Sequence, residues 1–247
     1  MNYFCFTYKK ELTKLLYKKK YYILTIIGFL FTLIRVGGGF LITKLSGGAV
    51  TVKSNMALEM LPFVIELLVP IIILIAVSEL FTHEISADTM KLSLTQPITR
   101  FKLLTAKSLA AITIGAMATV ALGVLNIILQ IILSGSPDNV FASLLAYIID
   151  IIPLIGVAFL GVIINVNLKA PSSATLLSLA VYGIFKYMGL YVSGASSFLF
   201  TSMARFHILF LGKALPLHII LSRAGVLFGS ILILYSISYI IFDRRNF

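Results

Sequence analysis

Polar side chains that could do chemistry gather in residues 81–102, between two long apolar runs. His83 and Glu84 begin like the zinc-binding helix of a metalloprotease. That helix needs a second histidine four residues after the first, and position 87 is alanine. The chain has three histidines, and no other pair has ligand spacing. We therefore expect no metal site, and we expect any hydrolytic chemistry to belong to another chain.

A second candidate is the glycine-containing segment 47–54, which nearly matches a phosphate-binding loop. Val52 stands where such a loop needs glycine, because the backbone must wrap around phosphate. The serine elbow of hydrolases is absent from the sequence, and no two carboxylates can be assigned acid and base roles. The single cysteine, Cys5, cannot form an internal disulfide. We therefore expect this chain to bind no nucleotide or other cofactor.

The elements that must position these residues are membrane helices. Hydrophobic residues make up 60% of the 247 positions, charged residues make up 12%, and the mean hydropathy is +1.06. Such a chain has too little polar surface for a water-soluble fold, and its apolar runs are long enough to cross about 30 Å of hydrocarbon as helices. We expect an all-α protein with six spans, at 21–42, 61–81, 108–133, 140–166, 174–192 and 224–242.

The net charge of +11 is best explained by orientation in a membrane. Thirteen of the 20 basic residues lie in segments 1–20, 82–107, 168–174 and 243–247. Short cytoplasmic loops collect lysine and arginine, so the bias places both termini in the cytoplasm of a multi-pass protein of the cell membrane. A nucleic-acid surface would need aromatic side chains among the basic ones on a soluble face, so we expect no nucleic-acid partner.

Two short helices are expected on the cytoplasmic side. Residues 1–20 contain an amphipathic stretch, with Phe4, Tyr8, Leu12, Leu15 and Leu16 on one face, that predicts a helix lying on the membrane surface. In the polar interval, Asp88 or Ser86 can cap a helix through Leu94, and Pro97 stops it. Thr99 can then cap the next helix, which carries Arg100, Lys102 and Lys107.

The polar interval resembles the cytoplasmic loop of ABC-2 type permeases, the membrane subunits of ABC exporters. In that family the loop follows the second span and contains the coupling helix that docks on a separate ATPase subunit. The family has glycine before the threonine, where this chain has Asp88. The resemblance assigns coupling roles within 82–102 and just beyond it to Glu84, Asp88, Thr89, Leu92, Pro97, Arg100 and Lys107, and Leu94 also fits the pattern.

The resemblance also implies an assembly. It implies one permease domain over residues 1–247, paired with a second permease copy and with two ATPase subunits that hold ATP and magnesium. Residues 193–223 would be a re-entrant element, although a plain outer loop fits equally well. An amphipathic or antimicrobial peptide is the preferred cargo, for export or immunity, with a lipid or drug as alternatives. A membrane scaffold or sensor that binds an ATPase without transport is the main rival, ahead of an intramembrane enzyme.

Polar residues inside the expected spans form a last group. Arg35 and Glu66 fall at similar depth, as do Asp150 and Lys186, so we expect two neutralising pairs within the spans. Membrane lipids are expected to surround the bundle. Each pair could be structural or could lie on the substrate path. Asn126 and Gln130 share one helix face, which indicates hydrogen bonding between helices or a contact with substrate.

Overall fold

The computed structural model describes residues 3–45, 56–95, 97–134, 139–192, 194, 199–211 and 215–246. The segment 47–54, which resembles a phosphate-binding loop, lies outside the described residues. Within the described part, the secondary structure is helical and strands do not occur. The prediction of an all-α protein is therefore confirmed.

Five described helical stretches are long and apolar enough to cross a membrane. They correspond to five of the six expected spans and show a multi-pass membrane protein. The sixth expected span, 174–192, coincides with helix α10 (Pro171–Tyr191), whose 21 residues do not meet the same criterion. The six-span count therefore stays a prediction. The five stretches are Lys19–Gly39, Met56–Ser86, Arg100–Leu133, Val140–Asn167 and Leu217–Arg244.

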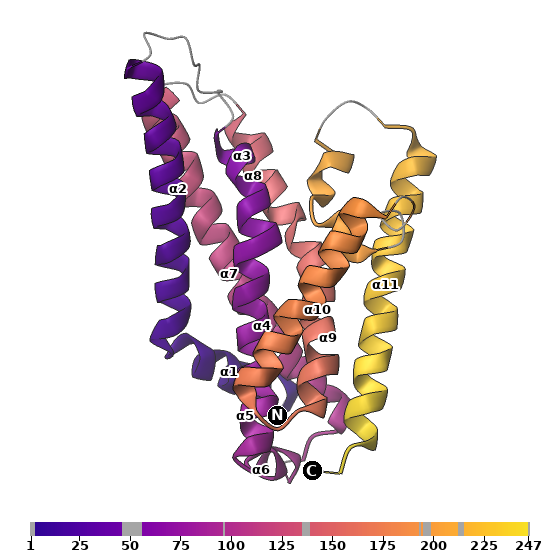
Figure 1. The fold of residues 1–247 in the computed structure, drawn as a ribbon. Coiled ribbons are helices and arrows are strands. Elements are labelled where there is room, and N and C mark those ends of the chain that lie inside the picture. Colours follow the sequence, from indigo (N-terminus) through magenta and orange to yellow (C-terminus); the bar gives the residue numbers. More distant parts are fainter. Residues whose placement is uncertain are drawn as a thin grey trace.

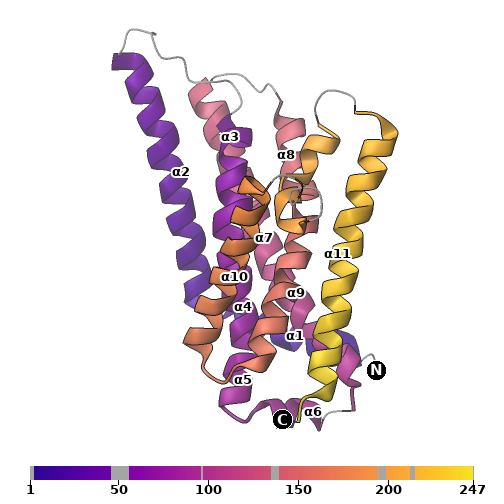
Figure 2. The ribbon, with the colours of Figure 1, turned by 45° about the vertical axis from the view of Figure 1, so that its right-hand side comes forward.

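The long helices form a bundle with both termini at one end (Figure 1). We call this end the base. Helix α1 (Tyr3–Leu16) lies across it, below α2 (Lys19–Leu45), and the short helices α5 (Thr82–Ser86) and α6 (Met90–Leu94) project beyond it. Figure 2 shows the same arrangement after a turn of 45°, with α2 and α11 (Leu217–Arg244) on the two flanks.

Helix α1 meets the core through a mixed face. Thr7, Glu11 and Leu15 are its buried residues, with Tyr8, Leu12 and Leu16 partly buried beside them. The expected apolar face is thus only part of what packs, because a buried carboxylate joins it. The reason lies in the neighbouring helix, which offers that carboxylate a positive charge, as described below.

The second span is made of three helical segments, α3 (Met56–Phe63), a π-helical turn over Val64–Leu68 and α4 (Val69–Leu80). Pro70 has no N–H to donate to the carbonyl of Glu66 four residues earlier, and its ring clashes with that carbonyl. The π turn widens the helix at this point. The freed Glu66 carbonyl accepts a 2.8 Å hydrogen bond from the Tyr182 hydroxyl, which satisfies it within the membrane.

The third span is one continuous helix, α7 (Arg100–Ser134), and it forms the centre of the bundle. Residues buried on α4, α7 and α9 (Ile151–Asn167) make up most of the core. Glycines let α7 and α9 pack closely against α4. A Cβ atom added at Gly115 would clash with Ile73 at 2.4 Å, and one added at Gly161 would clash with Leu74 at 2.7 Å. Helix α7 packs against α1, α2, α4, α9 and α11.

The fourth span is broken at Asp150, between α8 (Val140–Ile149) and α9. The chain beyond α10 then turns back towards the bundle through two short 3-10 helices, Phe200–Met203 and Phe206–Leu209. Phe200, Met203 and Phe206 are buried in the core. The described residues 199–211 thus form a folded element that packs on the bundle, and residues 217–223 are already part of α11.

Candidate coupling site at the base

The polar interval folds as two helices joined by a tight turn. Neither expected cap acts as one, because α6 begins after Thr89 and the Ser86 hydroxyl donates to the His83 carbonyl at 2.9 Å. Asp88 lies in the turn with φ of +54°, in the left-handed region that favours glycine. This conformation explains why the resembling family has glycine there. Thr99 does precede α7, and its hydroxyl accepts the Lys102 N–H at 3.4 Å.

Lys107 is the centre of a buried ionic network. Its side chain is fully buried, and its Nζ lies 2.8 Å from Glu84 and 2.9 Å from Glu11. Glu84 also pairs with Lys14 on α1. The two carboxylates and two ammonium groups balance, so the burial of each charge is compensated. The network joins α1, α5 and α7 near α5, at the start of the polar interval. We call this part of the site its root.

A second ionic group ties the start of α2 to the end of α4. Glu79 is 8% exposed and pairs with Lys18 and Lys20, and it also accepts a hydrogen bond from the Tyr21 hydroxyl at 3.2 Å. Burial lowers the pKa of Lys18, and the charge of nearby Lys14 lowers this pKa further. Glu79 thus connects the end of α4 to the basic segment 18–20.

Helix α5 is also fixed to the opposite side of the bundle. The Thr82 hydroxyl lies 2.8 Å from the carbonyl and from the side-chain Oδ1 of Asn165 on α9. The Asn165 amide donates in turn to the Ser178 hydroxyl of α10 at 2.8 Å. All three residues are buried, so a displacement of α5 acts on α9 and α10 as well as on α7.

The start of α7 is connected to the C-terminal residues. Arg100 donates to the backbone carbonyls of Asp243 and Arg245. A cation near these last carbonyls of α11 satisfies groups that have no partner within the helix. Burial lowers the pKa of the Arg245 guanidinium. Arg100 thus acts inside the chain, as a link between α7 and α11.

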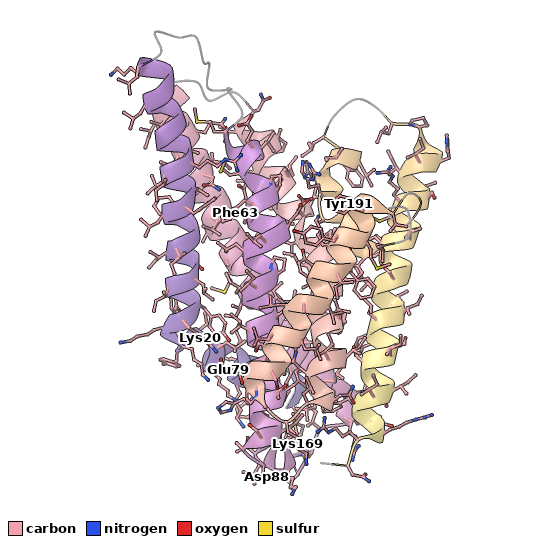
Figure 3. All side chains as sticks on the ribbon, in the orientation of Figure 1. Lys20, Phe63, Glu79, Asp88, Lys169 and Tyr191 are labelled. Atoms are coloured by element: carbon pink, nitrogen blue, oxygen red, sulfur yellow. The ribbon has the colours of Figure 1, made fainter. Side chains whose placement is uncertain are left out.

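The candidate coupling residues therefore divide into two kinds. Glu84 and Lys107 are buried, whereas Asp88, Thr89, Leu92 and Pro97 are exposed, and the Leu92 side chain is 68% exposed. Beside the exposed group lies a cavity of about 360 Å³. Figure 3 shows Asp88 and Lys169 at this tip of the molecule. The cavity is lined by Ile85, Ser86, Asp88, Met90, Lys91, Lys169, Arg245 and Asn246.

In this arrangement a polar tip projects from a membrane bundle, and its root is held by buried charges. The family model described as ABC-2 family transporter protein matches residues 6–247. The chain belongs to the ABC-2 family. It is thus the membrane subunit of an ABC transporter, and its family implies an ABC ATPase as partner. No curated protein matches the chain.

We call the half of the bundle farther from the base the outer half. In this ABC-2 chain it holds a separate ionic group around Glu66. Its carboxylate lies 2.9 Å from Lys186 and 3.1 Å from Arg205. The expected Arg35–Glu66 pair is wrong, because Arg35 is an exposed residue of α2 and Glu66 faces α10. The π turn before Pro70 carries Glu66, so sequence spacing alone misplaces its direction.

Asp150 has a different partner from the one expected. Its carboxylate accepts the backbone N–H of His207 at 2.8 Å and lies 2.7 Å from the His207 ring nitrogen Nδ1. The expected Asp150–Lys186 pair is therefore wrong, since Lys186 pairs with Glu66. The folded 199–211 segment brings both Arg205 and His207 into the bundle, which hydropathy could not foresee.

Asn126 and Gln130 hold helices together. The Asn126 amide donates to the Tyr147 hydroxyl at 2.9 Å, and that hydroxyl donates to the Ala57 carbonyl at 3.0 Å. Gln130 accepts the Ala57 N–H at 3.0 Å, which satisfies a backbone donor at the start of α3. These contacts favour the interhelical explanation for both residues over a contact with substrate.

Two residues of the base site were missed from the sequence. Glu11 lies within a strongly basic helix, and Lys14 lies opposite the apolar face expected for that helix, so neither stands out in the sequence as a member of a buried network. Glu11 is the only acidic residue among the first 20 positions, between six lysines. A lone acid in an apolar stripe was the available signal, and it points to a buried basic partner.

Proposed function

We propose that this chain forms half of the translocation pathway of an exporter, as a dimer with a second permease and driven by two ATPase subunits. The observation that carries the proposal is the division of the base site. Helix α6 and the turn before it form an exposed tip. The adjoining part of the site, its root, is held in place by the ion pairs of Lys107. A docking element needs both an accessible surface and a stiff connection to the helices that move.

In this mechanism the ATPases hold ATP and magnesium, and they push on α5 and α6 as they close. The Glu84–Lys107 contact passes the displacement to α7, while Thr82 and Asn165 pass it to α9. Packed helices shift as rigid bodies because their interfaces do not deform continuously. The resulting movement opens the pathway between the two permease copies on the side opposite the base.

The proposed orientation places the base in the cytoplasm. Lysine and arginine gather at this end, on α1, on the 82–107 interval and after α11. The orientation brings α6 to the side where ATP is available, as docking to an ATPase requires. The N- and C-termini are then both cytoplasmic.

The proposed cargo is an amphipathic peptide, for export or for self-protection against an antimicrobial peptide. The described helices carry no large domain outside the bundle that could handle a polymer. Paired ionic groups around Glu66 and Asp150 could contact a cationic amphipathic molecule in the outer half. A lipid or a drug has the same mixture of apolar and charged parts, and the transport experiment below distinguishes them.

The proposal is tested by reconstitution. The chain is co-expressed with a candidate ABC ATPase subunit, purified in mild detergent and placed in vesicles with fluorescent peptide, lipid or drug. We expect ATP-dependent accumulation of one of these. The Leu92→Asp variant should lose the bound ATPase, because it places a charge on the exposed docking helix.

Leu217→Asp is the matched control, since Leu217 is 70% exposed but lies at the opposite end of the bundle. It should retain the ATPase and transport. Equal ATPase recovery with both variants would disprove docking on α6. ATPase binding without movement of any cargo would instead support the scaffold or sensor.

A further inference from the structure

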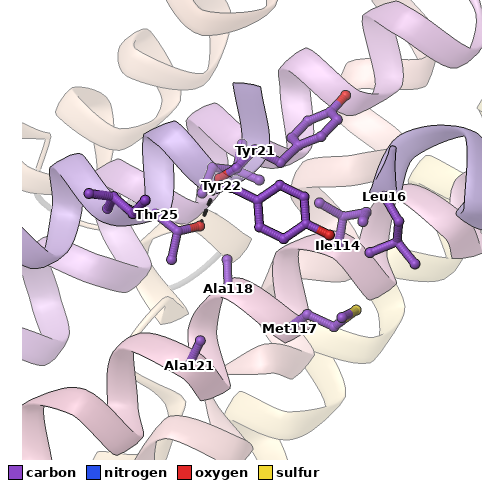
Figure 4. A pocket seen from close by; sticks show the side chains of 10 residues that line it. Leu16, Tyr21, Tyr22, Thr25, Ile114, Met117, Ala118 and Ala121 are labelled. Carbon is purple, nitrogen blue, oxygen red and sulfur yellow. Dashed lines mark hydrogen bonds between the residues drawn. The ribbon is translucent and has the colours of Figure 1, made fainter. Parts of the chain in front are cut away.

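An apolar groove opens at the base where α1 and α2 meet α7 (Figure 4). Its volume is about 220 Å³, and its lining is almost wholly apolar. Ala118 and Ala121 form the floor on α7, and their small side chains leave the hollow below Thr25. The Thr25 hydroxyl already donates its proton to the Tyr21 carbonyl at 2.9 Å, so that proton is not available to a ligand.

One cation stands at the end of this groove nearest the base. Lys19 precedes Tyr22 by one helical turn and Ile26 by two, so all three lie on one stripe of α2. Tyr22 and Ile26 line the groove. Lys18 and Lys20 share the single carboxylate of Glu79, so that group keeps one net positive charge. Lys19 is exposed and has no ion-pair partner within the described residues.

We propose that this groove binds one acyl chain of an anionic phospholipid from the leaflet next to the base, with the phosphate at Lys19. The groove alone would not select a lipid, because lipid tails are as apolar as the side chains that line it. Selectivity comes from the charge of Lys19 and from the concave fit. A lysine near a membrane surface contributes roughly a fivefold preference for an anionic headgroup.

The site would join two parts of the coupling machinery. Leu16 at the end of α1 and Tyr21 at the start of α2 form one wall, and Ile114 and Met117 of α7 form the other. A chain lying between these walls lies beside Tyr21, whose hydroxyl donates to Glu79. Anionic lipid should therefore raise the thermal stability of the purified chain, with or without an ATPase.

The absence of tryptophan from the chain gives a direct test. Tyr22→Trp places one fluorescent reporter in the groove with little change in size. Its quenching is measured in vesicles of phosphatidylglycerol and phosphatidylcholine, each in turn carrying brominated acyl chains. We expect about a fivefold preference for phosphatidylglycerol. Adding Lys19→Gln should lower the ratio of quenching by phosphatidylglycerol to quenching by phosphatidylcholine.

Lys169→Gln is the matched control, since it removes the same charge from the base at a distance from the groove (Figure 3). It should keep the full preference. Ala121→Phe should fill the hollow and reduce quenching by both lipids. Equal quenching by the two lipids, or equal losses with Lys19→Gln and Lys169→Gln, would overturn the proposal. Quenching by neither lipid would overturn it too, because another copy of the chain would then cover the groove.

Discussion

The ionic groups at the base and those in the outer half differ in burial and in what they join. At the base, Lys107 is 0% exposed and is enclosed by carboxylates from α1 and α5. In the outer half, the side chain of Glu66 is 21% exposed and that of Arg205 is 49% exposed. One group joins helices within the core, and the other holds short 3-10 helices against it.

The difference shows how one bundle can be stiff at one end and loose at the other. A buried charge that loses its partner cannot turn to water, so the base network resists separation. A partly exposed charge can exchange its partner for solvent at small cost. Force applied to α5 should thus be transmitted without loss, while the outer contacts of Glu66 can break as the pathway opens.

The largest expected effect comes from Lys107→Met. This substitution keeps the length of the side chain but leaves the two buried carboxylates of Glu11 and Glu84 with Lys14 as their one positive partner, at a cost of about 3–5 kcal/mol. Thermal unfolding of the purified protein in detergent measures the loss. Lys102→Met, an exposed lysine of the same helix, should change the stability little. A small effect at Lys107 would remove the contrast between the two ends.

A smaller effect is expected from Lys186→Met in the outer half. Glu66 keeps Arg205 at 3.1 Å and remains partly exposed, so the cost should be about 1–2 kcal/mol in the same unfolding measurement. Combining Lys186→Met with Arg205→Met should exceed the sum of the single effects. If Lys186→Met alone were as damaging as Lys107→Met, the outer group would be as rigid as the base.

The smallest expected effect is a gain, from Asp88→Gly in the turn between α5 and α6. The φ of +54° is unfavourable for aspartate and permitted for glycine, so stability should rise by about 0.5–1 kcal/mol. Ser86→Gly is the control, because Ser86 lies in α5 and glycine there should destabilise the helix. The Asp88 carboxylate lies 3.4 Å from the ammonium group of Lys91. A loss of stability with Asp88→Gly would show that this contact contributes more than the relief of backbone strain.

Much of this architecture follows from hydropathy and local signals. The helical class, five of the expected spans and the start of α7 after Thr99 were predictable, because long apolar runs and a capping hydroxyl act locally. The polar interval was also located correctly as the segment that projects from the base. Its resemblance to ABC-2 permeases over seven ordered positions agrees with the family match to residues 6–247.

The partners of the intramembrane charges were not predictable. Pairing by depth assumes straight helices, yet the π turn before Pro70 changes the direction of Glu66, and the break at Asp150 does the same in span four. Arg205 and His207 belong to a segment that hydropathy places outside the bundle. The internal use of Glu84, Lys107 and Arg100 was equally hidden, because sequence order cannot tell a docking side chain from one that holds the docking element.

The Lys107 network also constrains the order in which the molecule can be assembled during synthesis. Glu11 leaves the ribosome 96 residues before the lysine that neutralises it, and Glu84 emerges 23 residues before that lysine. Helix α1 therefore cannot take its final position until the third span has entered the bilayer. The first two spans must wait in the insertion machinery, or beside it, with an incomplete base.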